Sequence, residues 1–337
     1  MGSHNSANGS SELTMTVIGC GTMGIAILSG ILAALQEMQA SSTTTKAAQQ
    51  PSPSGTSTPA EEIPARLPSL FIACVRRHES AKKVKAALSS HLSAVKVVQN
   101  DNVASAQAAD IVLLACKPYM VADILSEPGM REALAGKLLI SILAGVGVPQ
   151  LEKSLYGDDS AVPSKNRTTT IVRAMPNTAS LIRQSMTVIG ITTPALPEET
   201  TSLVTWIFKR IGDVVYLPPS TMDACTALCG SGPAFFALML EAAIDGAVAM
   251  GLPRAEAQRM AAQTMLGTAG LVLNGDHPAL LKDKVSTPGG CTIGGLLVLE
   301  EGRVRGTVAR AVREATVVAS QLGKGVQGVN GTRFHGN

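Results

Sequence analysis

The chain has 337 residues, which is enough for one or two domains with sizeable hydrophobic cores. Hydrophobic residues make up 45% of the sequence and aromatic residues only 3%, so aliphatic side chains must build most of the core. The net charge of +3 is too small, and the charges are too scattered, for a nucleic-acid-binding protein.

Residues 1–14 are polar and lack the basic start and apolar block of a secretory signal. We therefore expect a disordered N-terminal tail and a cytoplasmic protein. No uninterrupted apolar run is long enough to cross a bilayer, and the longest candidate, Phe235 to Met250, carries Glu241 and Asp245. This segment predicts a buried helix, and no membrane partner is expected.

Six cysteines are scattered without the spacing of a disulfide framework. Cys225 and Cys229 lie close together, but no histidine or second cysteine pair accompanies them. Reduced thiols in an intracellular protein are the expected state, and we expect no metal site.

A dinucleotide-binding pattern follows the first predicted strand, Met15 to Ile18. The strand leads into Gly19-Cys20-Gly21-Thr22-Met23-Gly24, with the spacing G-x-G-x-x-G, and then into an apolar helix from about Ile25 to Leu35. The first glycine makes the tight turn, the second lets the backbone approach a pyrophosphate, and the third lets the helix pack on the strand. The free N–H groups of the helix then face the phosphates, so this context favours a dinucleotide site.

The residues from about 36 to 68 are rich in Ser, Thr, Pro and Ala and contain few large apolar side chains. Such a segment cannot bury enough surface to offset the entropy lost on ordering. We predict a disordered insertion between the first helix and the second strand, and a tolerated surface loop accounts for it better than a function does.

The second predicted strand, Leu70 to Val75, ends at Arg76 and Arg77. An NAD-binding fold carries an acidic residue here that holds the ribose 2′-hydroxyl, and Glu79 comes slightly late for that role. Arginines would instead meet the 2′-phosphate of NADP with charge and planar donors. A solvated basic turn is the alternative, and NADP is favoured.

Further strands alternate with helices and predict a mostly parallel, doubly wound sheet within a dinucleotide-binding domain of residues 15–217. These strands are expected at 96–98, 110–115, 137–143 and 170–174. Ligands of such sheets bind beyond the C-terminal ends of the strands. The loops that should face one crevice start at Gly19, Arg76, Lys117, Ala144 and Asn177.

After residue 217 the pattern changes to long helices rich in Ala, Leu and Met. They are apolar nearly all round, which is more than one small domain can bury. We expect a helical domain over 218–323 whose extra faces meet another subunit, followed by a flexible tail at 324–337.

A polar loop within this helical region lies in the segment from His277 to Ile293. Its hydroxyl residues bracket Pro288-Gly289-Gly290, a composition that suits a loop whose N–H groups close around a small anion. An isolated Pro-Gly-Gly is better interpreted as a plain turn between helices. Together with the upstream dinucleotide pattern, however, the loop indicates an enzyme.

The chain resembles the pyrroline-5-carboxylate reductase family from about Met15 to Leu322, apart from the insertion. The matching residues are Ile18–Gly24, Cys116–Pro118, Arg173–Thr178, Gly230–Phe235, Gly251–Arg254, Ala262–Thr264 and the segment from His277 to Thr292. The resemblance implies an α/β N-terminal Rossmann-type dinucleotide-binding domain followed by an all-α C-terminal dimerisation domain. It also implies an NAD(P)H-dependent oxidoreductase that reduces the C=N bond of 1-pyrroline-5-carboxylate to L-proline.

The resemblance also implies roles for individual residues. The cofactor-binding residues would be Gly19, Gly21, Thr22, Met23, Gly24, Arg76, Arg77, Asn102, Lys117, Pro118, Ala144, Gly145 and Asn177. The substrate-binding residues would be Ser286, Thr287, Gly289, Gly290 and Thr292. The loop would hold the substrate carboxylate, and Thr292, as the catalytic residue, would hydrogen-bond the ring nitrogen. NADPH is the implied cofactor, with NADH as an alternative.

Members of this family form homodimers with interlocked helical domains, often assembled into decamers. The substrate loop of one subunit would then meet a nicotinamide held by the other. Two residues depart from the family pattern: Cys291 stands where Ala or Thr is usual, and Cys229 stands where Ser is more common. Both side chains are small, so we expect activity to survive.

Hydride transfer to a cyclic imine requires a polarised C=N bond, which protonation of the nitrogen supplies. Because this imine can be cationic near neutral pH, no strong acid is essential. His277 is the nearest candidate acid, but its position before Pro278 favours a structural cap. The main tasks of the protein would be orientation and electrostatics.

Two other functions stay open from the sequence. A 3-hydroxyacid dehydrogenase with a helical second domain would use a lysine as acid and base, and Lys282 is the candidate, although the surrounding loop does not match. A catalytically silent NADP sensor is the other alternative, but a sensor would not need the intact loop from Val285 to Ile293.

Overall fold

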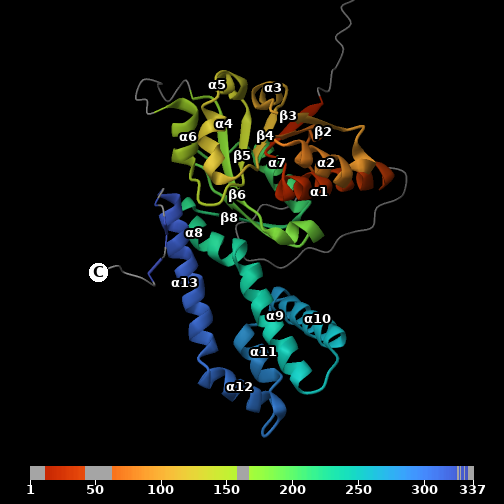
Figure 1. Cartoon of the computed structure of the whole chain (residues 1–337), viewed down its shortest axis with the longest axis vertical. Helices are drawn as coiled ribbons and strands as arrows, with labels where there is room; N and C mark the ends of the chain where they lie inside the picture. The colour runs from red at the N-terminus through yellow and green to blue at the C-terminus, as the bar shows by residue number, and fades with distance from the viewer. Residues whose placement is uncertain are drawn as a thin grey trace, which may run out of the picture.

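The computed structural model describes residues 12–41, 63–157, 167–324, 326, 328–329 and 331–332. Figure 1 shows an α/β domain from which a group of helices extends as a long arm. All strands belong to the first part, and every element after β8 is helical. The predicted fold class, a Rossmann-type domain followed by an all-α region, is confirmed.

One eight-stranded sheet forms the centre of the α/β domain, in the order β3-β2-β1-β4-β5-β6-β7-β8. The strands are β1 (Leu13–Ile18), β2 (Pro68–Val75), β3 (Val95–Gln99), β4 (Ile111–Leu114), β5 (Leu138–Ser141), β6 (Thr170–Met175), β7 (Ser185–Gly190) and β8 (Gly212–Leu217). Paired strands run parallel, except for β6 and β7. The strand order reverses between β1 and β4, the position at which doubly wound sheets bind their ligands.

Helices cover both faces of the sheet. They are α1 (Thr22–Ser41), α2 (His78–Ala87), α3 (Asn102–Gln107), α4 (Val121–Leu125), α5 (Met130–Leu134), α6 (Val148–Tyr156) and α7 (Glu198–Lys209). One hydrophobic cluster joins the sheet to α1, α2 and α7 and contains Trp206. A second joins it to α3, α4, α5 and α6. Successive strand residues Leu113 and Leu114 belong to different clusters, so the strand is buried on both faces, as in other parallel sheets.

Two predicted boundaries differ from the structure. α1 runs to Ser41, well beyond the predicted end near Leu35, so the start of the predicted insertion is helical. This part of the sequence still consists of good helix formers, and Met38 packs on the core. β1 begins at Leu13, inside the predicted N-terminal tail, because Leu13 is buried and pairs with Pro68. Residues 1–11 and 42–62 lie outside the described part of the chain.

The C-terminal helices form an arm without a core of its own. They are α8 (Met222–Cys225), the π-helix η6 (Thr226–Gly230), α9 (Gly232–Ala249), α10 (Arg254–Leu273), α11 (Pro278–Lys284), α12 (Cys291–Glu301) and α13 (Val304–Gly323). α9 packs along α10, α12 packs on α13, and α13 returns to α8 and η6 beside the sheet (Figure 1). A single residue is buried in each of α9, α10 and α13, and none is buried in α12.

The prediction that Phe235 to Met250 forms a buried helix is wrong for the single chain. α9 covers most of this stretch, yet its one buried residue is Gly232, and Leu238 is 66% exposed. By length and composition, Thr22–Ala40 and Pro219–Ala249 could each cross a membrane. The first lies in a helix that packs on the sheet and the second reaches into the arm, so both are weak evidence for a membrane. A large exposed apolar surface on the arm instead indicates an interface.

Candidate active site

The glycine loop after β1 has the geometry that the sequence predicts. Gly19 has a left-handed φ of +76°, and a Cβ atom there would lie 2.5 Å from the Cα of Cys116. A Cβ on Gly24 would lie 2.9 Å from Cγ1 of Val17, so this glycine lets α1 approach β1. A Cβ on Gly21 would meet nothing closer than 3.9 Å, which leaves open space where a pyrophosphate would approach.

A helix N-terminus and two arginines lie at the same strand ends as this open loop. Thr22 and Met23 begin α1, and the N–H groups of a first helical turn have no partner within the helix. Arg76 and Arg77 follow the neighbouring strand β2, and both side chains are exposed. Neither arginine forms an ion pair within the described residues, so both remain available to an anionic ligand.

Asn102 begins α3, close to the end of β3. Its Oδ1 accepts a hydrogen bond from Sγ of Cys74 at 3.3 Å, and its Nδ2 donates to Oε2 of Glu127 at 3.3 Å. The carbonyl oxygen of Cys74 accepts from the N–H groups of Gly19 and Cys20 at 3.0 and 3.1 Å. Asn102 is thus tied to the glycine loop through one residue. Sequence reasoning missed Cys74 and Glu127, because spacing along the chain does not reveal such contacts.

Two further predicted cofactor loops follow β4 and β5. Lys117 and Pro118 follow β4 and are exposed. After β5, Ala144 is exposed and Gly145 is half-buried, with a φ of +73°. A Cβ on Gly145 would lie 3.5 Å from Cβ of Leu322, so the end of α13 packs beside this loop.

Asn177, after β6, has a structural task in the described chain. Its Oδ1 accepts a hydrogen bond from the N–H of Ala179 at 3.0 Å and caps the short helix Thr178–Ile182. Its own N–H donates to Oγ of Ser185 at 3.0 Å. A role toward a cofactor stays a prediction. Since the strands before all five loops run parallel, these loops lie at one edge of the sheet, as predicted.

Arg173 is a residue whose importance the sequence motif did not reveal. It lies in β6 beside Ser141 of β5. Burial lowers the pKa of its guanidinium, while the nearby Asp223 and Cys225 oppose that shift. Its Nε and Nη2 are buried and have no hydrogen-bond partner within the described residues. Because buried donors are normally satisfied, these two indicate an acceptor from water, a ligand or another chain.

The cysteines near the glycine loop are not nucleophiles. All six cysteines of the chain are free. Burial raises the pKa of Cys20 to about 12 and that of Cys116 to about 11, so both thiols stay protonated near neutral pH. Among the described residues, no group of three or more His, Cys, Asp or Glu side chains is placed to hold a metal ion.

The predicted substrate loop connects α11 to α12 and contains a tight turn. Gly289 has a φ of +67°, and the N–H of Gly290 donates to the carbonyl oxygen of Thr287 at 3.0 Å. A proline followed by a glycine with positive φ is typical of a type II turn. A Cβ on Gly290 would collide with Oγ1 of Thr287, so a larger residue there would require the Thr287 side chain to rotate.

The turn leads directly into the N-terminus of α12. Gly290 is the N-cap, and Thr292 lies half-buried in the first turn. Free N–H groups and the positive end of the helix dipole suit a carboxylate at this position. Oγ of Ser286 donates to the carbonyl oxygen of Lys282 at 2.9 Å, which leaves its lone pairs free. The predicted substrate residues therefore share one loop and one helix start.

The two residues considered as proton donors are engaged in other contacts. Nδ1 of His277 accepts a hydrogen bond from the N–H of Ala279 at 3.3 Å, which confirms the predicted cap of α11. Nζ of Lys282 lies 2.6 Å from Oδ1 of Asp283. Neither contact favours an acid at the loop.

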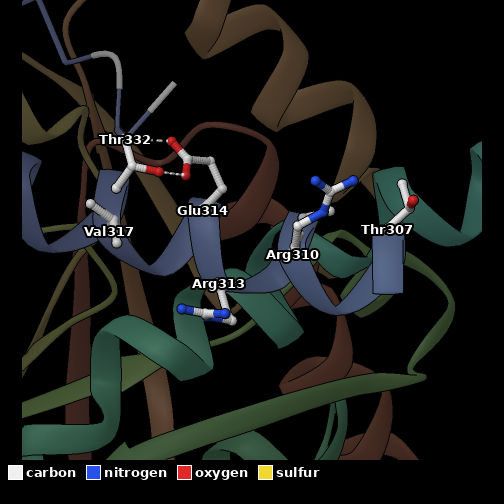
Figure 2. A pocket seen from close by; sticks show the side chains of 7 residues that line it. Thr307, Arg310, Arg313, Glu314, Val317 and Thr332 are labelled. Carbon is white, nitrogen blue, oxygen red and sulfur yellow. Dashed lines mark hydrogen bonds between the residues drawn. The ribbon is translucent and has the colours of Figure 1, made fainter. Parts of the chain in front are cut away.

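The dinucleotide loop and the substrate loop occupy different parts of the chain. Figure 1 shows α11 and α12 at the far end of the arm, away from the sheet. A cavity of about 520 Å³ lies on α13 and is lined by Thr307, Arg310, Ala311, Arg313, Glu314, Val317 and Thr332. Figure 2 shows Glu314 directed at Thr332, whose N–H donates to Oε1 of Glu314 at 2.5 Å. None of the predicted site residues lines this cavity.

The sheet, its glycine loop and the glycine turn before α12 are those of a dinucleotide-dependent oxidoreductase with a helical second domain. Residues 219–322 match the family model for pyrroline-5-carboxylate reductase dimerisation, and residues 57–145 match the model for NADP oxidoreductase, coenzyme F420-dependent. A pyrroline-5-carboxylate reductase of Lophium arboricola is 67% identical over 98% of this chain and 99% of its own. A pyrroline-5-carboxylate reductase of Neurospora crassa is 60% identical over 96% of this chain and 97% of its own. The chain therefore belongs to the pyrroline-5-carboxylate reductase family.

Solved structures agree with this assignment. A pyrroline carboxylate reductase of Plasmodium falciparum with NADP bound has a TM-score of 0.69 and 25% identity, covering 92% of this chain and 98% of that one. A pyrroline-5-carboxylate reductase of Coxiella burnetii has a TM-score of 0.71 and 26% identity over the same shares. The family predicted from the motifs is confirmed, and the 3-hydroxyacid dehydrogenase alternative is wrong.

Proposed function

We propose that the chain reduces 1-pyrroline-5-carboxylate to L-proline, with NADPH as the preferred hydride donor and NADH as a second one. The observation that carries this proposal is the combination of an open glycine loop after β1 with a glycine turn that begins α12. The first suits a dinucleotide pyrophosphate and the second suits a small carboxylate. The names of the relatives at 67% and 60% identity support the same reaction.

The residues at the strand ends fit NADPH. The open space at Gly21 admits a pyrophosphate, and Arg76 and Arg77 place two exposed cations where a 2′-phosphate would lie. Residues 117–118 and 144–145 follow β4 and β5, and they would line the nicotinamide. When bound, NADPH supplies the hydride that reduces C5 of the imine. NADP in the Plasmodium falciparum structure supports this cofactor.

The turn before α12 would hold the substrate carboxylate. The N–H of Gly289, the hydroxyl of Thr287 and the free N–H groups in the first turn of α12 would be the donors, while Ser286 and Gly290 bond within the chain and shape the loop. Thr292 would bond the ring nitrogen. One neutral hydrogen bond contributes only about 1 kcal/mol net. Several donors in a fixed geometry therefore outweigh any single side chain. Because the imine can be cationic near neutral pH, the main task of these residues would be to orient it, and no strong acid is essential.

The chain associates with other copies, because residues 219–322 match a dimerisation domain. We propose a homodimer with interlocked helical domains, assembled further into a decamer. The exposed leucines of the arm support the dimer, and the distance of α12 from the sheet supports a site shared between two chains. Sedimentation of the purified protein tests the decamer: a dimer without larger species would contradict it.

We also propose that the protein is cytoplasmic. Of the two long apolar segments, one packs on the sheet and the other belongs to the dimerisation domain, so neither needs a membrane to cover it. Cell fractionation tests this location, and recovery of the protein with membranes or inside an organelle would contradict it.

The direct test is the loss of NADPH absorbance when purified protein meets 1-pyrroline-5-carboxylate, with NADH in parallel. We expect rapid, substrate-dependent oxidation that is faster with NADPH. Intact NADPH binding without oxidation would overturn the proposal and favour a silent NADP sensor.

Thr292→Val tests the contact to the ring nitrogen. We expect kcat to fall roughly tenfold, because one hydrogen bond to a charged group is lost, while NADPH affinity is unchanged. Thr292→Ser keeps the hydroxyl and is the control, which should retain most of the activity. Unchanged kinetics in the valine variant would remove Thr292 from the catalytic role.

A further inference from the structure

A short chain of hydrogen bonds links the glycine loop to the adenosine end of the proposed cofactor site. The carbonyl oxygen of Cys74 holds the N–H groups of Gly19 and Cys20, and its thiol donates to Oδ1 of Asn102. Nδ2 of Asn102 donates in turn to Oε2 of Glu127 at 3.3 Å. Asn102 therefore stands between a thiol donor on one side and a carboxylate acceptor on the other.

Glu127 is held in place independently of any ligand. It lies between α4 and α5, and its carbonyl oxygen accepts from the N–H of Met130 at 3.0 Å at the start of α5. α5 packs against α3, the helix that begins with Asn102. Both side chains are half-buried, so the surrounding packing limits their movement.

The neighbours of an asparagine amide decide which way it faces, because its oxygen and nitrogen ends have nearly the same shape. An ionised carboxylate only accepts hydrogen bonds, so Glu127 must face Nδ2 of Asn102. The thiol of Cys74 donates, so it faces Oδ1. Burial raises the pKa of Cys74 and keeps that thiol protonated. A flipped amide would place Oδ1 against the carboxylate, which is repulsive.

We propose that Glu127 is a positioning residue that fixes the amide orientation of Asn102 for binding of the adenosine end of NADPH. The inference rests on the proposed contact between Asn102 and that end of the cofactor. One N–H of Asn102 is used by Glu127, and the second remains for an oxygen of the ribose or its phosphate. An amide free to flip would present its oxygen to those acceptors for part of the time.

Glu127→Gln tests this role, because a glutamine can donate as well as accept and so permits both orientations of Asn102. We expect the Kd of NADPH, measured by calorimetry, to rise roughly twofold to tenfold, the effect of about one hydrogen bond. The kcat at saturating NADPH and the KM of the imine should not change. Glu132→Gln is the matched control, because Glu132 lies on the surface of α5 and pairs only with Arg131 within the described residues.

A double-mutant cycle separates positioning from a general structural effect. Glu127→Gln should have no further effect on NADPH affinity once Asn102→Ala is present, and Glu127→Asp, which remains an acceptor, should restore part of the affinity. The inference would be overturned if Glu127→Gln lowered NADPH affinity equally in the wild type and in Asn102→Ala, or if it did not lower the affinity of the wild type. If Asn102→Ala itself leaves NADPH affinity unchanged while reduction continues, the adenosine contact fails and the inference fails with it, but the proposed reaction stands.

Discussion

The α/β domain and the helical arm use similar apolar residues with opposite results. In the α/β domain, large side chains such as Trp206, Phe71 and Phe208 are fully buried between the sheet and its helices. In the arm, Leu238 is 66% exposed and Leu273 75% exposed, although α9 is at least as apolar as the core helix α1. The first region satisfies its hydrophobic pattern within one chain, whereas the second requires another chain to do so.

This difference has a consequence for the site. The dinucleotide loop belongs to the self-contained region, so its shape is complete in one chain. The substrate loop, from Val285 to Gly290, belongs to the arm, so its surroundings depend on assembly. Cofactor binding and catalysis should therefore respond differently to changes that separate the subunits.

The largest effect is expected from a charge on the exposed face of the arm. Leu238→Glu should dissociate the oligomer and lower kcat at least a hundredfold, because an unpaired buried charge costs several kcal/mol. NADPH binding should persist. Sedimentation and calorimetry measure the two responses. Leu92→Glu is the control, because it places the same charge on a 46% exposed leucine of the α/β domain. It should change neither the oligomeric state nor NADPH binding. Dissociation of this control would show that the effect is not specific to the arm.

Within the self-contained region, two glycines should separate folding from binding. Gly19→Ala should lower the free energy of unfolding by about 1–3 kcal/mol from its left-handed dihedral angle, with a further cost from the contact with Cys116. Gly21→Ala has room in the free chain, so the melting temperature should stay unchanged while NADPH binds more weakly. Equal melting temperatures for both variants would show that Gly19 is no more crowded or strained than Gly21.

The arginines after β2 test the cofactor preference. Arg76→Ala with Arg77→Ala should weaken NADPH roughly tenfold or more, because hydrogen bonds to a charged group each contribute about 1.5–3 kcal/mol. NADH binding should change little. The dissociation constants of NADPH and NADH measure this. An equal loss of affinity for both cofactors would show that Arg76 and Arg77 do not bind the 2′-phosphate.

The smallest effect is expected at the cap of α11. His277→Ala should cost about 0.5–1 kcal/mol of local stability and leave the pH dependence of kcat unchanged. His277→Asn retains a side-chain acceptor and should behave like the wild type. Loss of a titrating group from the pH profile would instead identify His277 as a proton donor.

Features that depend on local sequence were predicted well. The glycine loop and the cap at His277 follow from residue types at fixed spacing, and the parallel strands follow from the alternation of strands and helices. The positive φ at Gly289 agrees with the turn composition, while its ligand remains a prediction. The end of α1 was predicted too early, because residues 36–40 are good helix formers and Met38 packs on the core.

Features that depend on contacts between distant segments could not be predicted. The bonds of Asn102 to Cys74 and Glu127 join three separate segments, and no pattern along the chain signals them. The buried, unpaired donors of Arg173 are equally invisible in a sequence. The sequence predicted that extra apolar faces of these helices meet another subunit, but it did not show that α9, expected to be buried, is one of them, because an apolar composition does not say which chain covers a helix.

If a complete site forms only between two chains, mixed oligomers of two inactive variants should be active. One variant, Gly21→Asp, disables the dinucleotide loop, and the other, Gly290→Asp, disables the substrate loop. Each alone should be inactive. Co-expressed with different tags, they should regain about a quarter of wild-type activity, because half of randomly paired dimers are mixed and each mixed dimer holds one intact site. Mixed oligomers that form but remain inactive would contradict the account.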